Sequence, residues 1–105
     1  MVVKLYRVIW DNRAKESLKA ITLFINEESP TAAKKVRKEL LKLTASLKKM
    51  PERFSIEPYL EHKGYEYRSV TKWSYKIIYR VSEKEVRILE IVHTNRNTTV
   101  VEDIE

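Results

Sequence analysis

The sequence predicts an α+β domain with the element order β-α-α-β-β-β, in which a helical hairpin packs on a small, largely antiparallel sheet. Three observations support this fold. The chain opens with a β-branched and aromatic segment, continues with two segments of helical apolar spacing, and closes with segments of alternating side chains. Neither the helices nor the sheet can bury an apolar surface alone, so we expect them to pack together. The 105 residues fit one domain, 1–105, with an acidic tail at 101–105 that we expect to fray.

The first strand and the first helix follow from the N-terminal pattern. Residues 2–10 are rich in Val, Ile, Tyr and Trp, which predicts a strand. Asp11 and Asn12 come next, and both are good N-cap residues because their side-chain oxygens accept hydrogen bonds from the first helical turn. Apolar residues then recur at helical spacing, which predicts a helix over residues 13–28.

The second helix begins at Ser29-Pro30. Serine is a preferred N-cap, and proline at the first helical position loses no needed hydrogen bond. The apolar spacing predicts a helix over residues 30–49, ending before Pro51 because proline cannot continue a helix. The short junction predicts an antiparallel helical hairpin. Residues 51–64 lack periodicity and are expected to form a long loop.

The last third of the chain predicts an antiparallel meander of three strands. They span residues 65–71, 74–81 and 86–92. The final strand is apolar on both faces apart from Arg87 and Glu90, which predicts a central position in the sheet. Tyr75 and Tyr79 share the strand face that we assign to the core.

The charge favours an acidic partner. The formal net charge is +6 and the pI is about 9.5, which suits a nucleic acid, an acidic protein segment or an anionic membrane. The second predicted helix carries the surplus, because residues 30–50 hold seven basic residues and one acidic residue. The alternative is an ordinary amphipathic helix with a solvated basic face.

Several chemistries are excluded by composition. The absence of cysteine excludes disulfides, thiolate zinc sites and cysteine nucleophiles. Two histidines and one glycine are too few for a structural zinc site or a glycine-rich phosphate loop, so we expect no metal and no cofactor. No apolar run approaches the roughly 20 residues that span a bilayer. Lys4 and Arg7 interrupt any signal-peptide core, and we expect a cytoplasmic protein.

The end of the last strand offers the first candidate site. His93, Arg96 and Asn97 follow the apolar run, and Lys76 lies on the preceding strand. Histidine can move protons near neutral pH, and arginine is a rigid fork suited to phosphate. These groups could bind a phosphodiester and transfer its protons. The alternative is that they cap strand ends and shape a turn.

A second candidate is a basic patch for a nucleic acid or another target. It would combine Arg68, Lys72 and Lys76 with Arg96 and Asn97, interleaved with Tyr67, Trp73 and Tyr75. Aromatic rings on a basic sheet can stack on bases. They can equally be core residues and cross-strand pairs.

Two loop acids lie within reach of this patch. Glu57 and Glu61 are the acids best placed to serve as a general base beside it. The alternative for both is a solvated loop carboxylate.

The order of elements and several local runs resemble the RelE/ParE superfamily of bacterial toxins from type II toxin–antitoxin pairs. The resemblance covers nearly the whole chain. It rests on the Ser29-Pro30 junction followed by alanines, on the run from Tyr75 to Val81, and on the run from Val86 to His93 with Arg96 beyond it. It implies the hairpin-on-sheet fold and a growth-arresting toxin.

The superfamily implies two different activities. RelE-type members are endoribonucleases that cut mRNA on the ribosome, and ParE-type members poison DNA gyrase without nuclease activity. Lys76 falls where RNA-cleaving members carry an arginine, Arg96 falls on their later arginine, and His93 and Glu57 lie near their histidine and glutamate. On that reading these four residues would be catalytic.

The departures favour the gyrase-directed branch. Lys76 cannot make the bidentate fork of an arginine, and no tyrosine follows Tyr79. The long hairpin also resembles ParE. The alternatives are RelE-type mRNA cleavage and a non-toxic basic module that binds nucleic acid.

The resemblance also implies a protein partner. A cognate antitoxin, acidic and partly disordered, should fold onto the basic surface at the helical hairpin and the neighbouring sheet edge. A toxin dimer or a heterotetramer with the antitoxin would be compatible with the superfamily.

Overall fold

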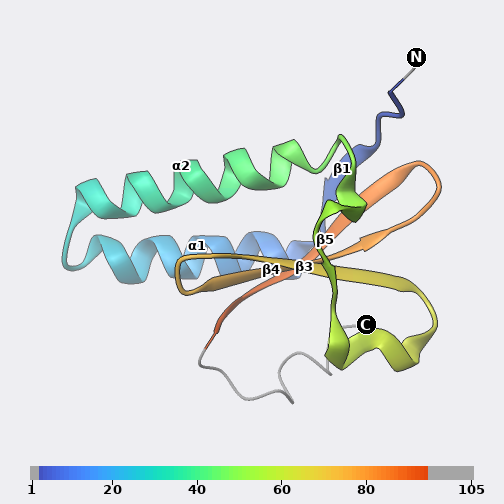
Figure 1. Ribbon diagram of the computed structural model, residues 1–105. Coiled ribbons are helices and arrows are strands. Elements are labelled where there is room, and N and C mark those ends of the chain that lie inside the picture. Colours follow the sequence, from blue (N-terminus) through green and yellow to red (C-terminus); the bar gives the residue numbers. More distant parts are fainter. Residues whose placement is uncertain (1–2, 95–105) are drawn as a thin grey trace.

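A computed structural model describes residues 3–94 (Figure 1). It contains two long helices, two short 3₁₀ helices and a five-stranded mixed sheet. The elements are β1 (Arg7–Trp10), α1 (Asn12–Asn26), α2 (Pro30–Ser46), η1 (Pro51–Arg53), β2 (Ser55–Ile56), η2 (Pro58–Lys63), β3 (Glu66–Lys72), β4 (Tyr75–Val81) and β5 (Glu85–His93). The predicted α+β class and the helical hairpin are confirmed.

The sheet has the strand order β1-β5-β4-β3-β2. Strand β1 pairs with β5 in parallel, and all other pairs are antiparallel. Strand β5 is internal, as predicted, although β4 occupies the middle. The predicted first strand is too long, because the Tyr6 amide donates to the Lys48 carbonyl and directs the preceding residues toward the end of α2.

The hairpin junction forms as its residues predict. The Ser29 hydroxyl accepts a hydrogen bond from the Ala32 amide at 3.1 Å, and Pro30 opens α2. Both helices end two or three residues earlier than predicted. Met50 follows in the left-handed region with φ of 47°, which ends any helical continuation before Pro51.

Residues 51–64 are not the plain loop that the sequence predicted. Pro51 and Pro58 each open a 3₁₀ helix, and the two-residue strand β2 pairs with β3 between them. The Glu57 carboxylate accepts the Tyr59 amide at 3.3 Å and so caps η2. Gly64 ends η2 with φ of 82°, a conformation that favours glycine. Elements this short leave no periodic signal.

The sheet has an apolar cluster on each of its two faces. We call the face that packs against α1 and α2 the hairpin face. Its cluster includes residues of both helices and of the sheet: Ala14, Leu18, Leu40, Leu47, Ile77, Tyr79, Val86, Ile88 and Ile91. We call the opposite face, which η2 covers, the η2 face. Its cluster consists of Leu60, Tyr67, Ile78, Leu89 and Val92. Helix α1 lies between α2 and the sheet (Figure 1). A bulge at Leu89 shifts the register between β4 and β5 but keeps apolar residues on both faces.

Tyr79 anchors the hairpin face, as the sequence predicted. Its ring is fully buried, and its hydroxyl donates to the Pro51 carbonyl at 2.5 Å. Burial raises the pKa of Tyr79 to about 12, against the lowering effect of nearby Arg68. Tyr75 is half-buried and packs on the same cluster.

Candidate functional site

Lys76 and Glu57 form a charge pair on the η2 face. The Lys76 Nζ lies 2.7 Å from Oε2 and 3.0 Å from Oε1 of Glu57. The Glu57 carboxylate is fully buried, and only 20% of the Lys76 side chain is exposed. Oε2 makes no well-aligned hydrogen bond within the described residues, so the ammonium charge is what compensates it. The solvated loop carboxylate considered for Glu57 is therefore wrong, whereas Glu61 is exposed.

The Lys76 ammonium is also held by an aromatic ring. It lies 5.4 Å from the ring centroid of Tyr59, which comes from η2. Leu60 of η2 is fully buried in the apolar cluster beneath. The Lys76 ammonium thus connects β4, the middle strand of the sheet, to η2, which covers this face. It does so through Glu57 and Tyr59.

His93 lies on the opposite face of the sheet from Lys76. It pairs with Tyr75, whereas Lys76 pairs with Val92, and successive residues of a strand point to opposite faces. The His93 ring meets the Tyr75 ring edge-on, with centroids 5.7 Å apart and planes at 85°. His93 and Tyr75 line a pocket of about 540 Å³ with Ser17, Ile21 and Phe24 of α1.

The basic patch predicted from the sequence is divided by the same alternation. Arg68 pairs with Tyr79 and Lys72 pairs with Tyr75, which places both on the hairpin face, away from Lys76. The Arg68 guanidinium binds Glu66 at 2.7 Å and the Phe54 carbonyl at 2.6 Å.

The three interleaved aromatic residues are divided as well. Tyr67 is buried on the η2 face, and Tyr75 lies on the hairpin face. Trp73 lies in the turn between β3 and β4 and is half-exposed. The Lys72 ammonium lies over its ring, 4.8 Å from the ring centroid. Arg96 and Asn97 lie outside the described residues.

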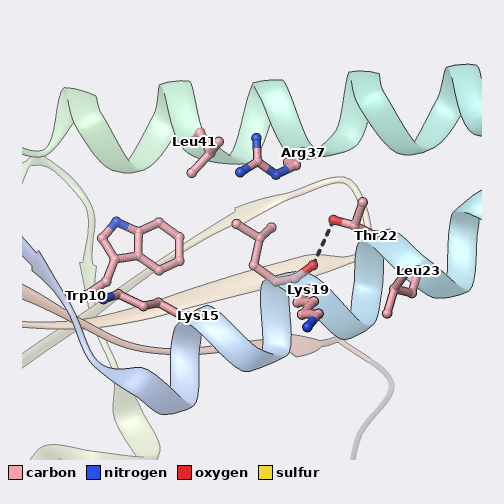
Figure 2. A pocket seen from close by; sticks show the side chains of 8 residues that line it. Trp10, Lys15, Lys19, Thr22, Leu23, Arg37 and Leu41 are labelled. Carbon is pink, nitrogen blue, oxygen red and sulfur yellow. Dashed lines mark hydrogen bonds between the residues drawn. The ribbon is translucent and has the colours of Figure 1, made fainter.

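A groove between α1 and α2 was not singled out in the sequence (Figure 2). It encloses about 460 Å³, and Trp10 of β1 closes one end. Lys15 and Lys19 of α1 and Arg37 of α2 form its charged rim. The one available signal was the i, i+4 spacing of the two lysines, which places them on one helix face beside an apolar stripe.

The described residues contain no group of three potential metal ligands. Over the same part of the chain, neither helix is long and apolar enough to cross a membrane.

Two helices packed on a five-stranded mixed sheet define the toxin fold of the RelE/ParE superfamily. A solved chain described as "Chromosomal ParDE TA system from P. aeruginosa" matches with a TM-score of 0.69 and 22% identity, over 88% of this chain and 99% of that one. The sequence model of the ParE toxin of the type II toxin–antitoxin system parDE matches residues 8–98. The chain therefore belongs to the ParE toxin family. Among curated proteins, none matches the sequence significantly.

Membership in this family confirms the resemblance seen in the sequence. The protein is the toxin of a type II toxin–antitoxin system, and an antitoxin partner is implied.

Proposed function

We propose that this protein arrests growth by poisoning DNA gyrase and that it does not cleave RNA. The observation that carries the proposal is the separation of the candidate nuclease residues, since Lys76 and Glu57 lie on the η2 face and His93 lies on the hairpin face. A phosphodiester bound at one face would leave the groups on the other face out of reach.

Glu57 is poorly suited to act as a general base. A base must lie within hydrogen-bond reach of the proton it removes, roughly 2.6–3.2 Å between heavy atoms. The Glu57 carboxylate is fully buried, and its oxygens are held by the Lys76 ammonium and the Tyr59 amide. Its geometry supports a structural role, which fixes η2 on the sheet.

Lys76 is poorly suited to stabilise a developing phosphate charge. Its ammonium is already compensated by a buried carboxylate at 2.7 Å, so an incoming phosphate would have to compete with that contact. Lysine also lacks the planar fork that binds two phosphate oxygens at once.

A gyrase poison needs binding contacts rather than an acid and a base. The protein has the fold of ParE-type toxins and a net charge of +6, and its cytoplasmic target would place it in the cytoplasm. The same charge favours an acidic antitoxin that neutralises the toxin by covering it.

The direct test is to induce the protein alone in growing bacteria and to follow plasmid DNA beside total mRNA. Linearised plasmid and an SOS response with intact message are expected. Codon-phased cuts in translated message, with plasmid still supercoiled, would replace the proposal with RelE-type cleavage. Normal growth with abundant folded protein would contradict the proposal that the protein arrests growth at all.

A further inference from the structure

The side of α2 that points away from the molecule carries a row of lysines. Helix α2 is the outermost layer, since α1 lies between it and the sheet (Figure 1). Its buried residues, Ala33, Leu40 and Thr44, lie on one side of the helix. At about 100° of rotation per residue, the opposite side holds four exposed lysines, which we call the lysine row: Lys34, Lys35, Lys38 and Lys42.

The lysine row has no compensating negative charge within the described protein. None of its four side chains forms an ion pair with a carboxylate of residues 3–94, and the one acidic residue of α2, Glu39, is less exposed than they are. Five basic side chains of α1 and the sheet, by contrast, have carboxylate partners: Arg7, Arg13, Arg68, Lys76 and Arg87.

The lysine row weakens the helix that carries it. Lys38 lies four residues after Lys34 and four before Lys42, so these ammonium groups are neighbours on the helix surface. Like charges at this spacing destabilise a helix, whereas a glutamate four residues from a lysine stabilises it. No ion pair among the described residues offsets the repulsion. An anionic partner would supply the missing compensation.

The classes of anionic partner differ in what they need besides charge. A protein interface takes most of its binding energy from buried apolar and aromatic anchors, and lysine is depleted there. A membrane surface needs the apolar face of a helix to enter the lipid. The apolar face of α2 is buried, and its solvent side offers only Thr31 and Ala45 beside the lysine row. The phosphate backbone of a nucleic acid, by contrast, is bound through cations.

The length of the lysine row also suits a phosphate backbone. Lys42 lies eight residues after Lys34, which is about 12 Å along the helix axis. One strand of duplex DNA presents about four phosphates over that length, since they follow one another every 3.4 Å or so of axis. We propose that the lysine row binds the phosphate backbone of duplex DNA without reading its sequence. The choice of DNA rests on the proposed function, because gyrase brings the toxin to a DNA duplex.

The experiment measures binding of the purified toxin to a fluorescently labelled DNA duplex of mixed sequence over a range of salt concentrations. The logarithm of the binding constant falls with the logarithm of the salt concentration, with a slope of roughly −0.9 for each phosphate contact. The test variant combines Lys38→Gln and Lys42→Gln. The matched control combines Lys15→Gln and Lys19→Gln, which are exposed and have the same spacing on α1. We expect the slope to become less steep by about 1.8 in the test variant and to stay nearly unchanged in the control.

Stability measurements separate lost contacts from lost structure. The test variant removes repulsion between neighbouring lysines, so its urea unfolding midpoint should be equal to or higher than that of the unmodified toxin. A second test pair, Lys34→Gln with Lys38→Gln, should give the same change in slope. Equal changes in slope for the test and control pairs would overturn the proposal, because binding would then depend on net charge alone. DNA binding that does not weaken with added salt would also overturn it.

The same variants distinguish the other possible occupants. Loss of binding to phosphatidylserine vesicles in the test variant, with DNA binding intact, would make the lysine row a membrane contact. Tighter binding of an RNA duplex of equal length at the same salt concentration would assign the row to RNA. Either result would overturn the assignment to DNA. Because the binding assay contains no gyrase, failure of the proposed function is read separately, from plasmid integrity after induction of the unmodified toxin.

Discussion

A glutamate is buried on each face of the sheet, and the two carboxylates have different sets of hydrogen-bond and charge partners. On the hairpin side, Glu90 accepts hydrogen bonds from Arg13, from Ser17 and from the Ile91 amide. On the η2 face, Glu57 relies on the Lys76 ammonium and one amide. The hairpin face is covered by two long helices, and the η2 face by one six-residue 3₁₀ helix. The negative charge of Glu57 therefore depends mainly on one cationic partner, the Lys76 ammonium.

The largest expected effect comes from removing that partner. Lys76→Ala should lower the free energy of unfolding by about 3–5 kcal/mol, because it leaves a buried carboxylate without its counter-charge. Urea denaturation would measure the loss. The double variant Glu57→Gln with Lys76→Met should recover most of it, since both charges are gone. A loss below about 1 kcal/mol for Lys76→Ala would place the pair among solvated surface salt bridges.

Tyr79 should make the hairpin face sensitive to alkali. Its folded pKa is about 12, against 10.0 for the ordinary phenol, so the unfolded state releases its proton first as the pH rises. The stabilisation is complete below pH 10 and is lost as the pH rises to about 12, amounting to roughly 3 kcal/mol for two pH units.

The matched variant for this prediction is Tyr79→Phe. It keeps the ring and removes the titrating group, along with the hydrogen bond to Pro51. Unfolding free energies measured from pH 9 to 12 should fall less steeply than in the unmodified protein. Identical slopes would show that other groups dominate the alkaline transition.

Removing the cation beside Glu90 should have a smaller effect than removing Lys76. Arg13→Ala leaves the Ser17 hydroxyl and the Ile91 amide in place, and the Arg13 side chain is already 44% exposed. The expected loss is about 1.5 kcal/mol, the lower end for a hydrogen bond to a charged group. A loss as large as that of Lys76→Ala would mean that the two carboxylates are equally dependent on their cations.

The smallest expected effect is at His93. His93→Phe keeps a ring against Tyr75 and removes the group that could transfer protons. The loss of stability should be smaller than that for Arg13→Ala, below about 1.5 kcal/mol, and growth arrest should persist. Arrest that disappears while circular dichroism reports a folded protein would indicate proton transfer by His93 and favour the nuclease alternative.

The contrast between the faces also explains which parts of the fold and of the candidate site could be predicted from the sequence. The helical hairpin and the meander carry clear periods, and Ser29-Pro30 marks the junction between the helices. The sequence grouped the candidate residues by their position at strand ends, and this grouping did not show that Lys76 and His93 lie on opposite faces of the sheet. Their separation depends on register, since Lys76 lies opposite Val92 while His93 lies opposite Tyr75. The bulge that adjusts this register leaves no mark in the sequence.

The burial of Glu57 could not be predicted for a related reason. It depends on η2 folding back over the sheet, and a six-residue 3₁₀ helix beside a two-residue strand has too few residues to show a period. A glutamate immediately before Pro58 was the available hint, because a carboxylate can cap a helix that opens with proline.

The most direct test of the central claim uses purified components. The toxin is incubated in parallel with gyrase, ATP and supercoiled plasmid, and with ribosomes carrying a defined mRNA. We expect linear plasmid to accumulate after detergent and protease treatment, equally with the unmodified toxin and with His93→Phe, while the mRNA stays intact. Cleaved mRNA in the ribosome reaction, lost in His93→Phe and accompanied by unbroken plasmid, would contradict it.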